Sequence, residues 1–94
     1  MPLLFEWDPA KGRSNIAKHG VAFDEASTCF EDALSITIPD PLHSQEEERF
    51  VLIGHSHRNR ILVVVHTDGG ERIRIISARP ATNKERRFYE KDAD

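Results

Sequence analysis

The sequence predicts an α+β domain in which a short N-terminal strand and two helices precede an antiparallel sheet meander and a C-terminal helix. Three observations support this prediction. Helix start and stop residues bracket residues 9–19, β-rich runs separated by tight turns follow residue 48, and a charged helical segment closes the chain. Two tight turns in succession make neighbouring strands antiparallel, because parallel neighbours need a long crossover. We therefore expect a curved antiparallel sheet with the helices packed on one of its faces.

The N-terminal half begins with a weakly alternating strand over Leu3–Trp7. Asp8-Pro9 is typical of a helix start, since Asp is a good N-cap and Pro suits the first helical position. This helix is predicted to end at His19, because Gly20 is the glycine expected just past a helix. A second helix ends near Asp32. Its amphipathic stripe follows the spacing i, i+3, i+4, i+7 and consists of Phe23, Ala26, Ser27 and Phe30.

The rest of the chain is dominated by strand patterns. The predicted strands are Leu34–Ile38, Arg49–Ser56, Ile61–Thr67 and Arg72–Ala78. A polar loop, Leu42–Glu48, follows the first of them, and the later turns fall at Arg58-Asn59 and Asp68-Gly69-Gly70. The last helix is predicted from about Ala81 to Lys91.

The length of 94 residues allows one domain, spanning residues 1–94. A chain of this size has no room for a second domain or an enclosed cofactor fold, so we expect no cofactor. The single cysteine, Cys29, excludes an internal disulfide framework and a zinc site built from thiolates, which is typical of a protein in a reducing cytoplasm. No apolar stretch approaches the roughly 18 residues of a membrane span, so we expect a cytoplasmic protein with no membrane contact.

The formal net charge of −3 hides an uneven distribution. Residues 1–47 sum to −6, whereas residues 48–94 sum to +3 and contain eight arginines and two lysines. Arginine makes forked, bidentate contacts with phosphate or carboxylate groups. The alternative is that these arginines solubilise exposed strand faces.

The five histidines make a metal site worth testing. His55-Ser56-His57 places two imidazoles on one side of a strand. With Arg58-Asn59 as a two-residue turn, His55 lies opposite Leu62, and His66 lies opposite Val51. His66 is then roughly 13 Å along the strand from the position opposite His55, too far to share one ion. We expect no metal site and interpret the paired histidines as polar residues at a hairpin tip.

Nucleophilic catalysis has equally little support. Cys29 lies within the apolar part of the second helix and is most simply a small buried hydrophobic residue. The chain has no Gly-x-Ser-x-Gly elbow and no glycine-rich phosphate loop. Glu46-Glu47-Glu48 lies in a charged loop, where a solvated surface is the simpler interpretation.

Basic side chains in the second half are the remaining candidates. Arg79 continues the alternation of Ile73, Ile75 and Ser77, so a charge occupies the last step of an otherwise apolar row. Such a residue lies at the rim of the sheet, extends its head to solvent, or is held in a site. Arg74 lies on the opposite row.

Two helices add further groups. Arg86 and Tyr89 are i, i+3 neighbours on the last helix, while Lys18 and His19 end the first and supply a cation and a titratable imidazole. Charged groups of this kind stabilise a pentacoordinate phosphorane while a base activates a 2′-hydroxyl, which is metal-free RNA cleavage. The same residues occur on surfaces that only bind RNA or protein, so both alternatives stay open.

Several segments of the chain are familiar. They are Phe5-Glu6-Trp7-Asp8, Asn15, residues 18–26 (KHGVAFDEA), Glu48-Arg49-Phe50, Ile53-Gly54, residues 74–79 (RIISAR) and residues 85–90 (ERRFYE). In this order, from about Phe5 to Glu90, they resemble the BrnT family of bacterial toxins. The sequence departs from the family at Pro80, where another basic residue is common, and we expect Pro80 to start the last helix abruptly.

The resemblance implies a ribonuclease toxin of a type II toxin–antitoxin system with a RelE-like fold. Such toxins cleave RNA without a metal ion and thereby inhibit translation. The implied partner is a BrnA-like ribbon-helix-helix antitoxin, and operator DNA is bound only through the toxin–antitoxin complex. The alternative function is a non-catalytic module, such as a decayed toxin, that binds an antitoxin, an acidic protein or RNA through its arginines.

The resemblance also implies roles for single residues. Arg79 is the expected phosphate or transition-state ligand, assisted by Arg74 and Arg86. His19 and Tyr89 are candidates for proton transfer or base stacking. The implied RNA-binding residues are Lys18, Arg72, Arg86 and Arg87. The structural alternatives are that Lys18 and His19 stabilise the end of their helix through its dipole and that Tyr89 packs against the sheet.

Overall fold

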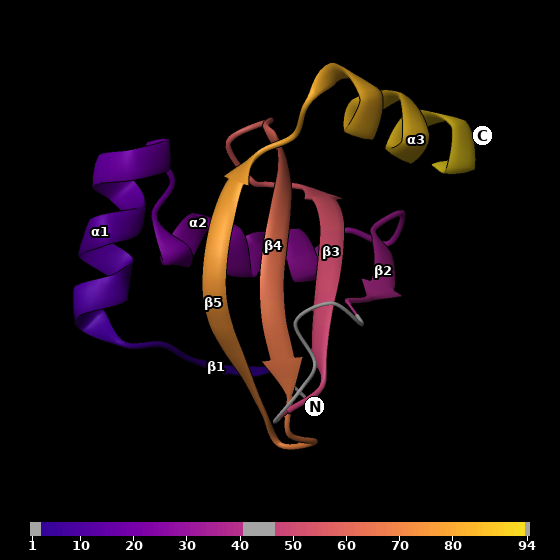
Figure 1. Cartoon of the computed structure of the whole chain (residues 1–94). Coiled ribbons are helices and arrows are strands. Elements are labelled where there is room, and N and C mark those ends of the chain that lie inside the picture. Colours follow the sequence, from indigo (N-terminus) through magenta and orange to yellow (C-terminus); the bar gives the residue numbers. More distant parts are fainter. Residues whose placement is uncertain (1–2, 41–46, 94) are drawn as a thin grey trace.

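The computed structural model describes residues 3–40 and 47–93, which form a five-stranded sheet with three α-helices and one 3₁₀ helix (Figure 1). The helices are α1 (Pro9–His19), α2 (Phe23–Thr28), the 3₁₀ helix η1 (Cys29–Glu31) and α3 (Asn83–Ala93). The strands are β1 (Leu4–Glu6), β2 (Ile36–Pro39), β3 (Arg49–His55), β4 (Ile61–Asp68) and β5 (Arg72–Pro80). The predicted α+β class and order of elements are confirmed. Most of the predicted loop Leu42–Glu48 lies outside the described residues.

The strands are ordered β1-β5-β4-β3-β2 in the sheet. Strands β2 to β5 form the predicted antiparallel meander. The prediction of a wholly antiparallel sheet is wrong at β1, which pairs in parallel with β5 and places Phe5 opposite Ile73. Most of the chain lies between these two strands, so no tight turn imposes an antiparallel pairing on them.

Helix α1 has the predicted boundaries. The Asp8 carboxylate accepts a hydrogen bond from the backbone N–H of Ala10 at 2.8 Å, and Pro9 begins the helix. Gly20 ends it in the left-handed conformation, with φ at 70°, and its N–H donates to the carbonyl of Ile16. None of the described helices is long and apolar enough to cross a membrane.

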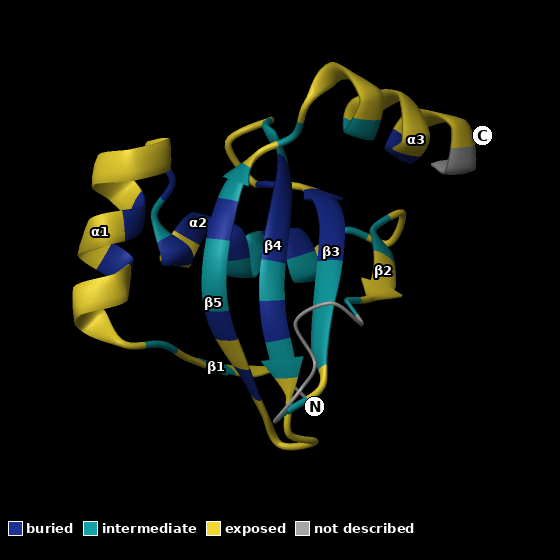
Figure 2. Cartoon of the chain, in the orientation of Figure 1, coloured by how far each residue is buried: buried dark blue, intermediate teal, exposed yellow. Residues whose placement is uncertain are grey.

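Helix α1 lies beside the β5 edge of the sheet, whereas α2 and η1 cover one of its faces, where α2 crosses behind the central strands in Figure 1. We call this face the helix face. Gly54 lies here because η1 packs very closely on β3; a Cβ atom at this position would lie 3.0 Å from the carbonyl oxygen of Cys29. The buried core comprises Val21, Phe23, Ala26, Cys29, Leu52, Leu62, Val64, Ile75 and Ala78. Figure 2 shows these buried segments along the central strands and the inner sides of the helices.

Helix α3 packs on the opposite face. Tyr89 lies against Ile53 and Val63 in a second, smaller cluster. These residues alternate with helix-face residues of the same strands, so they point to the other side of the sheet. The prediction that all helices pack on one face is therefore wrong for α3. Pro80 ends β5 and the helix begins at Asn83, so the expectation that Pro80 starts the last helix is also wrong.

A bulge in β5 changes which residues share a face. Val65 lies opposite Ser77, but the next residue of β4, His66, lies opposite Ile75, so Ile76 is an extra residue in the strand. After Ile76, each side chain of β5 points to the face opposite to the one that unbroken alternation predicts, and Ala78 is buried on the helix face. Arg79 therefore does not continue the row of Ile73 and Ile75, as the unbroken alternation predicted.

The β3–β4 hairpin also differs from its prediction. The N–H of Ser56 donates to the carbonyl of Arg60 at 2.7 Å, which leaves a three-residue connection ending at Asn59 with φ at 61°. Three-residue loops of this kind place a residue in the left-handed region, which Asn tolerates. The predicted two-residue turn is wrong. The register shifts by one, so that Phe50, not Val51, lies opposite His66.

Candidate active site

The face opposite the helix face carries arginines from two strands. Arg79 lies opposite Val63, and Arg74 lies opposite Thr67. Val63 and Thr67 are four residues apart in β4, so both point to the same side of the sheet. The bulge therefore brings Arg74 and Arg79 onto one face, which we call the arginine face, whereas the sequence predicted opposite rows.

Other arginines lie on the same face. Arg49 of β3 lies opposite Thr67, and Arg72 lies two residues before Arg74 in the same strand. Arg72 is exposed next to β1, where it lies opposite Leu4. The arginine face is thus defined by Arg49, Arg72, Arg74 and Arg79.

Arg79 is held by a carboxylate from the first turn of α3. Its Nη1 and Nη2 atoms donate to the two carboxylate oxygens of Glu85 at 2.7 and 2.8 Å, and Nη1 also donates to the carbonyl of Pro80 at 3.3 Å. This hydrogen bonding lowers the pKa of Glu85 to about 2 and raises the pKa of Arg79. Glu85 binds the end of the guanidinium formed by Nη1 and Nη2. The Nε hydrogen and the second Nη2 hydrogen of Arg79 therefore have no acceptor among the described residues.

Glu85 is itself fixed by a capping box. Its carboxylate accepts a hydrogen bond from the backbone N–H of Thr82 at 2.8 Å, and its own N–H donates to the Thr82 hydroxyl at 3.2 Å. The pattern Thr-x-x-Glu before a helix was a sequence signal for this arrangement. Arg79 therefore has a defined position relative to α3.

Arg74 has a partner of the same kind. Its Nη2 atom forms an ion pair with the carboxylate of Glu47, just before β3. Both side chains are more than a third exposed, so this ion pair is open to solvent and contributes little to stability.

Lys18 and His19 lie at the β5 edge of the sheet. With Ser77 and neighbouring residues they line a shallow hollow of about 180 Å³ between α1 and β5. Asn15 fixes α1 there: its amide donates to the carbonyls of Val21 and Ala78 at 2.8 and 2.7 Å and accepts from the N–H of Ala78 at 3.1 Å. The helix that ends in the exposed His19 is thereby fixed to Ala78, the residue before Arg79.

Tyr89 is separate from this hollow. Its ring is 7% exposed, and its hydroxyl donates to the carboxylate of Asp32 at 2.5 Å. Burial, then the hydrogen bond to Asp32, raises the pKa of Tyr89 to about 12. The hydroxyl therefore stays protonated at neutral pH and acts as a donor. Arg86 and Arg87 are exposed on α3, where they line a hollow of about 280 Å³ with Asn83 and Glu90.

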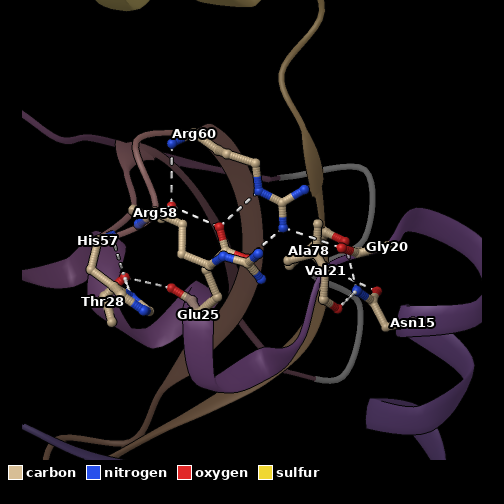
Figure 3. A network of polar contacts seen from close by, with 10 residues as sticks. Asn15, Gly20, Val21, Glu25, Thr28, His57, Arg58, Arg60 and Ala78 are labelled. Atoms are coloured by element: carbon tan, nitrogen blue, oxygen red, sulfur yellow. Dashed lines mark hydrogen bonds and ion pairs between the residues drawn. The ribbon is translucent and has the colours of Figure 1, made fainter.

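A buried polar network that the sequence did not suggest lies beneath the β3–β4 hairpin (Figure 3). Glu25 of α2 accepts hydrogen bonds from Nε of Arg60 at 2.9 Å and from the Ser56 hydroxyl at 2.7 Å, and it forms an ion pair with Nη2 of Arg60. Arg60 also donates to the carbonyl of Gly20, just after α1, at 3.1 Å. Hydrogen bonding to Arg60 lowers the pKa of Glu25. The network ties α1, α2 and the hairpin together and lies apart from the arginine face.

The other histidines among the described residues lie in two places. His55 and His57 line a hollow of about 310 Å³ with Asp32 and neighbouring residues, yet no three His, Cys, Asp or Glu side chains among the described residues are placed to hold a metal ion. His66 is buried between the rings of Phe30 and Phe50, with centroids at 4.8 and 6.0 Å, and burial lowers its pKa.

The fold and site define a small α+β protein with arginines gathered on one face of its sheet. The chain matches the family described as ribonuclease toxin, BrnT, of type II toxin–antitoxin systems over residues 7–85. The chain is also similar to the 1.1 Å crystal structure of the Brucella abortus ribonuclease toxin BrnT, with a TM-score of 0.68 and 30% identity over 87% of this chain and 100% of that chain. No match was found among curated proteins. The chain belongs to the BrnT family of ribonuclease toxins, which confirms the resemblance inferred from its motifs.

Proposed function

We propose that this toxin cleaves RNA without a metal ion on the arginine face, in the manner of RelE-like toxins. The observation that carries the proposal is the β5 bulge, which brings Arg79 and Arg74 onto one side of the sheet. Arg79 binds the scissile phosphate, and Arg74 assists. Contact with the rest of the RNA backbone comes from Lys18, Arg72, Arg86 and Arg87.

The proposed reaction is attack of a 2′-hydroxyl on the adjacent phosphorus. A base removes the hydroxyl proton, the new P–O bond closes a 2′,3′-cyclic phosphate, and the 5′-oxygen leaves with a proton from an acid or from water. Guanidinium groups stabilise the extra negative charge on the phosphorane. His19 is the candidate base because it is exposed beside β5, whereas Tyr89 is buried and protonated at neutral pH. Tyr89 is therefore proposed as a donor that holds α3.

The pairing of Arg79 with Glu85 is compatible with this role. Glu85 occupies the Nη1–Nη2 end of the guanidinium and leaves its Nε–Nη2 edge free of described acceptors. A guanidinium carries five N–H donors, so one edge can bind a phosphate while the other is fixed by a carboxylate. A positioned arginine needs no reorganisation when the transition state forms.

A second candidate function follows from the same ion pairs. Carboxylates from Glu85 and Glu47 already neutralise the two arginines. A non-catalytic module that binds an antitoxin, an acidic protein or RNA through this face would have the same paired arginines. Salt-sensitive RNA binding without cleavage products would favour it.

The proposed partner is a ribbon-helix-helix antitoxin of the BrnA type, with operator DNA bound only by the complex. Membership of a type II toxin–antitoxin family supports an antitoxin partner. We place the complex in the cytoplasm, where its RNA substrate and operator lie.

The test is induction of the toxin in growing cells together with cleavage of purified RNA in EDTA. Arg79→Ala should lower cleavage roughly 10²–10³-fold and restore growth, the loss expected when a transition-state donor is removed. Arg79→Lys keeps the charge but lacks the fork and should remain strongly impaired. Arg13→Ala, an exposed arginine of α1, is the matched control and should remain toxic.

Two results would refute the proposal. Intact RNA and normal growth with the unaltered protein would exclude a ribonuclease. Full activity of a folded Arg79→Ala variant would exclude the arginine face as the site.

A further inference from the structure

Helix α3 exposes an aromatic ring. Phe88 is 48% exposed, whereas Tyr89, the next residue, is 7% exposed and faces the sheet. About half of the Phe88 surface thus remains in contact with water, where burial of an apolar ring by a partner would be favourable. A ring left in solvent on a well-formed helix is available to a ligand.

Basic residues surround this ring at helical spacing. Lys84, Arg87, Phe88 and Lys91 follow the pattern i, i+3, i+4, i+7, and all four are exposed. Residues with this spacing form a continuous stripe on one face of a helix. We call it the α3 stripe. Its three cations form no ion pair with any described residue.

The composition of the stripe indicates the class of ligand. Lysine is depleted at the core of protein–protein interfaces, whereas exposed aromatic rings between cations are typical of surfaces that bind single-stranded nucleic acid. From Lys84 to Lys91 the helix rises about 10 Å, the length of about three stacked nucleotides. The stripe thus complements the charge, the length and the flat bases of a short single strand.

The stripe has a fixed relation to the arginine face. Glu85, which follows Lys84, holds the guanidinium of Arg79 through two hydrogen bonds. The first turn of α3 is thereby attached to the end of β5. A strand bound along α3 can continue to Arg79.

We propose that the α3 stripe is a binding platform for single-stranded RNA, in which Phe88 stacks on one base while Lys84, Arg87 and Lys91 contact the flanking phosphates. That the bound RNA is the substrate of the toxin rests on the proposed function. The binding of single-stranded RNA to the stripe is a separate property. Because every base has a flat face, the stripe binds single strands with little sequence preference.

The test is fluorescence anisotropy with the full chain and a short single-stranded 2′-O-methyl RNA, which cannot be cleaved. Phe88→Ala should weaken binding about fivefold to a hundredfold, the range for losing one stacked base. Phe88→Trp should preserve binding, and Leu34→Ala, which also removes an exposed apolar side chain, should not change it. Duplex RNA, whose bases are already stacked, should bind Phe88→Ala and the parent equally. Thermal unfolding checks that the variants are folded.

Unchanged affinity of folded Phe88→Ala for the single strand would overturn the platform, as would an equal loss for duplex. Weaker antitoxin binding with unchanged RNA binding would show that the stripe is a protein interface, which also overturns it. Cleavage measured in parallel separates the two proposals. Phe88-dependent binding without cleavage refutes only the nuclease, whereas RNA cleavage by a chain whose single-strand binding is independent of Phe88 refutes only the platform.

Discussion

Glu25 provides the sharpest test of how this fold is held together. Its side chain is 4% exposed, and it accepts hydrogen bonds from Ser56 and Arg60. Glu25→Ala leaves the guanidinium with the carbonyl of Gly20 as its remaining described acceptor. Breaking a buried ion pair by removing one partner costs 3–5 kcal/mol. The Arg60 side chain is 35% exposed and can be solvated, so we expect the lower end, about 3 kcal/mol.

This loss is large for a chain of 94 residues. One kcal/mol shifts the melting temperature of a domain of this size by about 4–8 °C, so the expected decrease is roughly 12–24 °C. Urea denaturation followed by circular dichroism measures the free energy of unfolding directly. Glu31→Ala, which removes an exposed glutamate of the neighbouring 3₁₀ helix, should change it by less than about 0.5 kcal/mol.

Two further variants test the physical reason. Glu25→Gln keeps the shape and one acceptor and should be less destabilising than Glu25→Ala. Glu25→Leu combined with Arg60→Met removes both charges and should recover much of the loss, because a packed apolar pair often equals a buried ion pair in stability. A loss below 1 kcal/mol in Glu25→Ala, or a double variant less stable than Glu25→Ala, would refute the assignment of a buried, paired charge.

Three more predictions concern other groups. Asn15→Ala removes three hydrogen bonds to buried backbone groups and should lower the free energy of unfolding in urea by about 2–4 kcal/mol, whereas a cost equal to that of the exposed Ser14→Ala would contradict the link between α1 and β5. Hydrogen bonding to Arg79 holds the pKa of Glu85 at about 2, below its ordinary value of 4.5, so its stabilisation is present above pH 4.5 and is lost as the pH falls toward 2. With the pair open to solvent, we expect this loss to be about 1–2 kcal/mol. Glu85→Gln should make the melting temperature depend less on pH between pH 4.5 and 2, and the same pH dependence as in the parent chain would exclude the pair. Burial raises the pKa of Cys29 to about 12, so an aromatic disulfide reagent should react only at the rate of unfolding, and rapid labelling of the native protein would contradict its burial.

Local signals in the sequence predicted the helix and strand order well. Asp8 and Gly20 define the ends of α1 because each acts on backbone groups within one turn of itself. Gly70, with φ at 91°, makes the second hairpin as predicted, because its conformation depends on two or three residues. Such features need no knowledge of distant parts of the chain.

The positions of the site residues depended on one non-local feature. The row of alternating residues in β5 is interrupted by the extra residue Ile76, which pairs with nothing in β4. Ile76 resembles its neighbours in size and β propensity, so nothing in the local pattern marks a bulge. One inserted residue moves Arg79 to the other face, since side chains alternate with a period of two. The motif containing Arg79 was found from the sequence, whereas the face that it shares with Arg74 was not.

Glu25 was missed for a related reason. An acidic residue in the first turn of a helix is usually explained by the helix dipole, and Glu25 fits that explanation. Its partner Arg60 lies 35 residues later on a different element. Only the packing of α2 beneath the hairpin reveals that this carboxylate is buried.

The charge distribution is explained by two different uses of the basic residues. Arg79 and Arg74 are paired with carboxylates, so each is positioned but electrically neutralised. A neutral pair attracts a distant phosphate weakly, although its free N–H groups still bind one that arrives. The three cations of the α3 stripe, which form no ion pair among the described residues, supply attraction over the screening length of about 10 Å at 0.1 M salt. In the proposed function, a chain with a net charge of −3 therefore attracts RNA through one helix and orients its phosphate at another element.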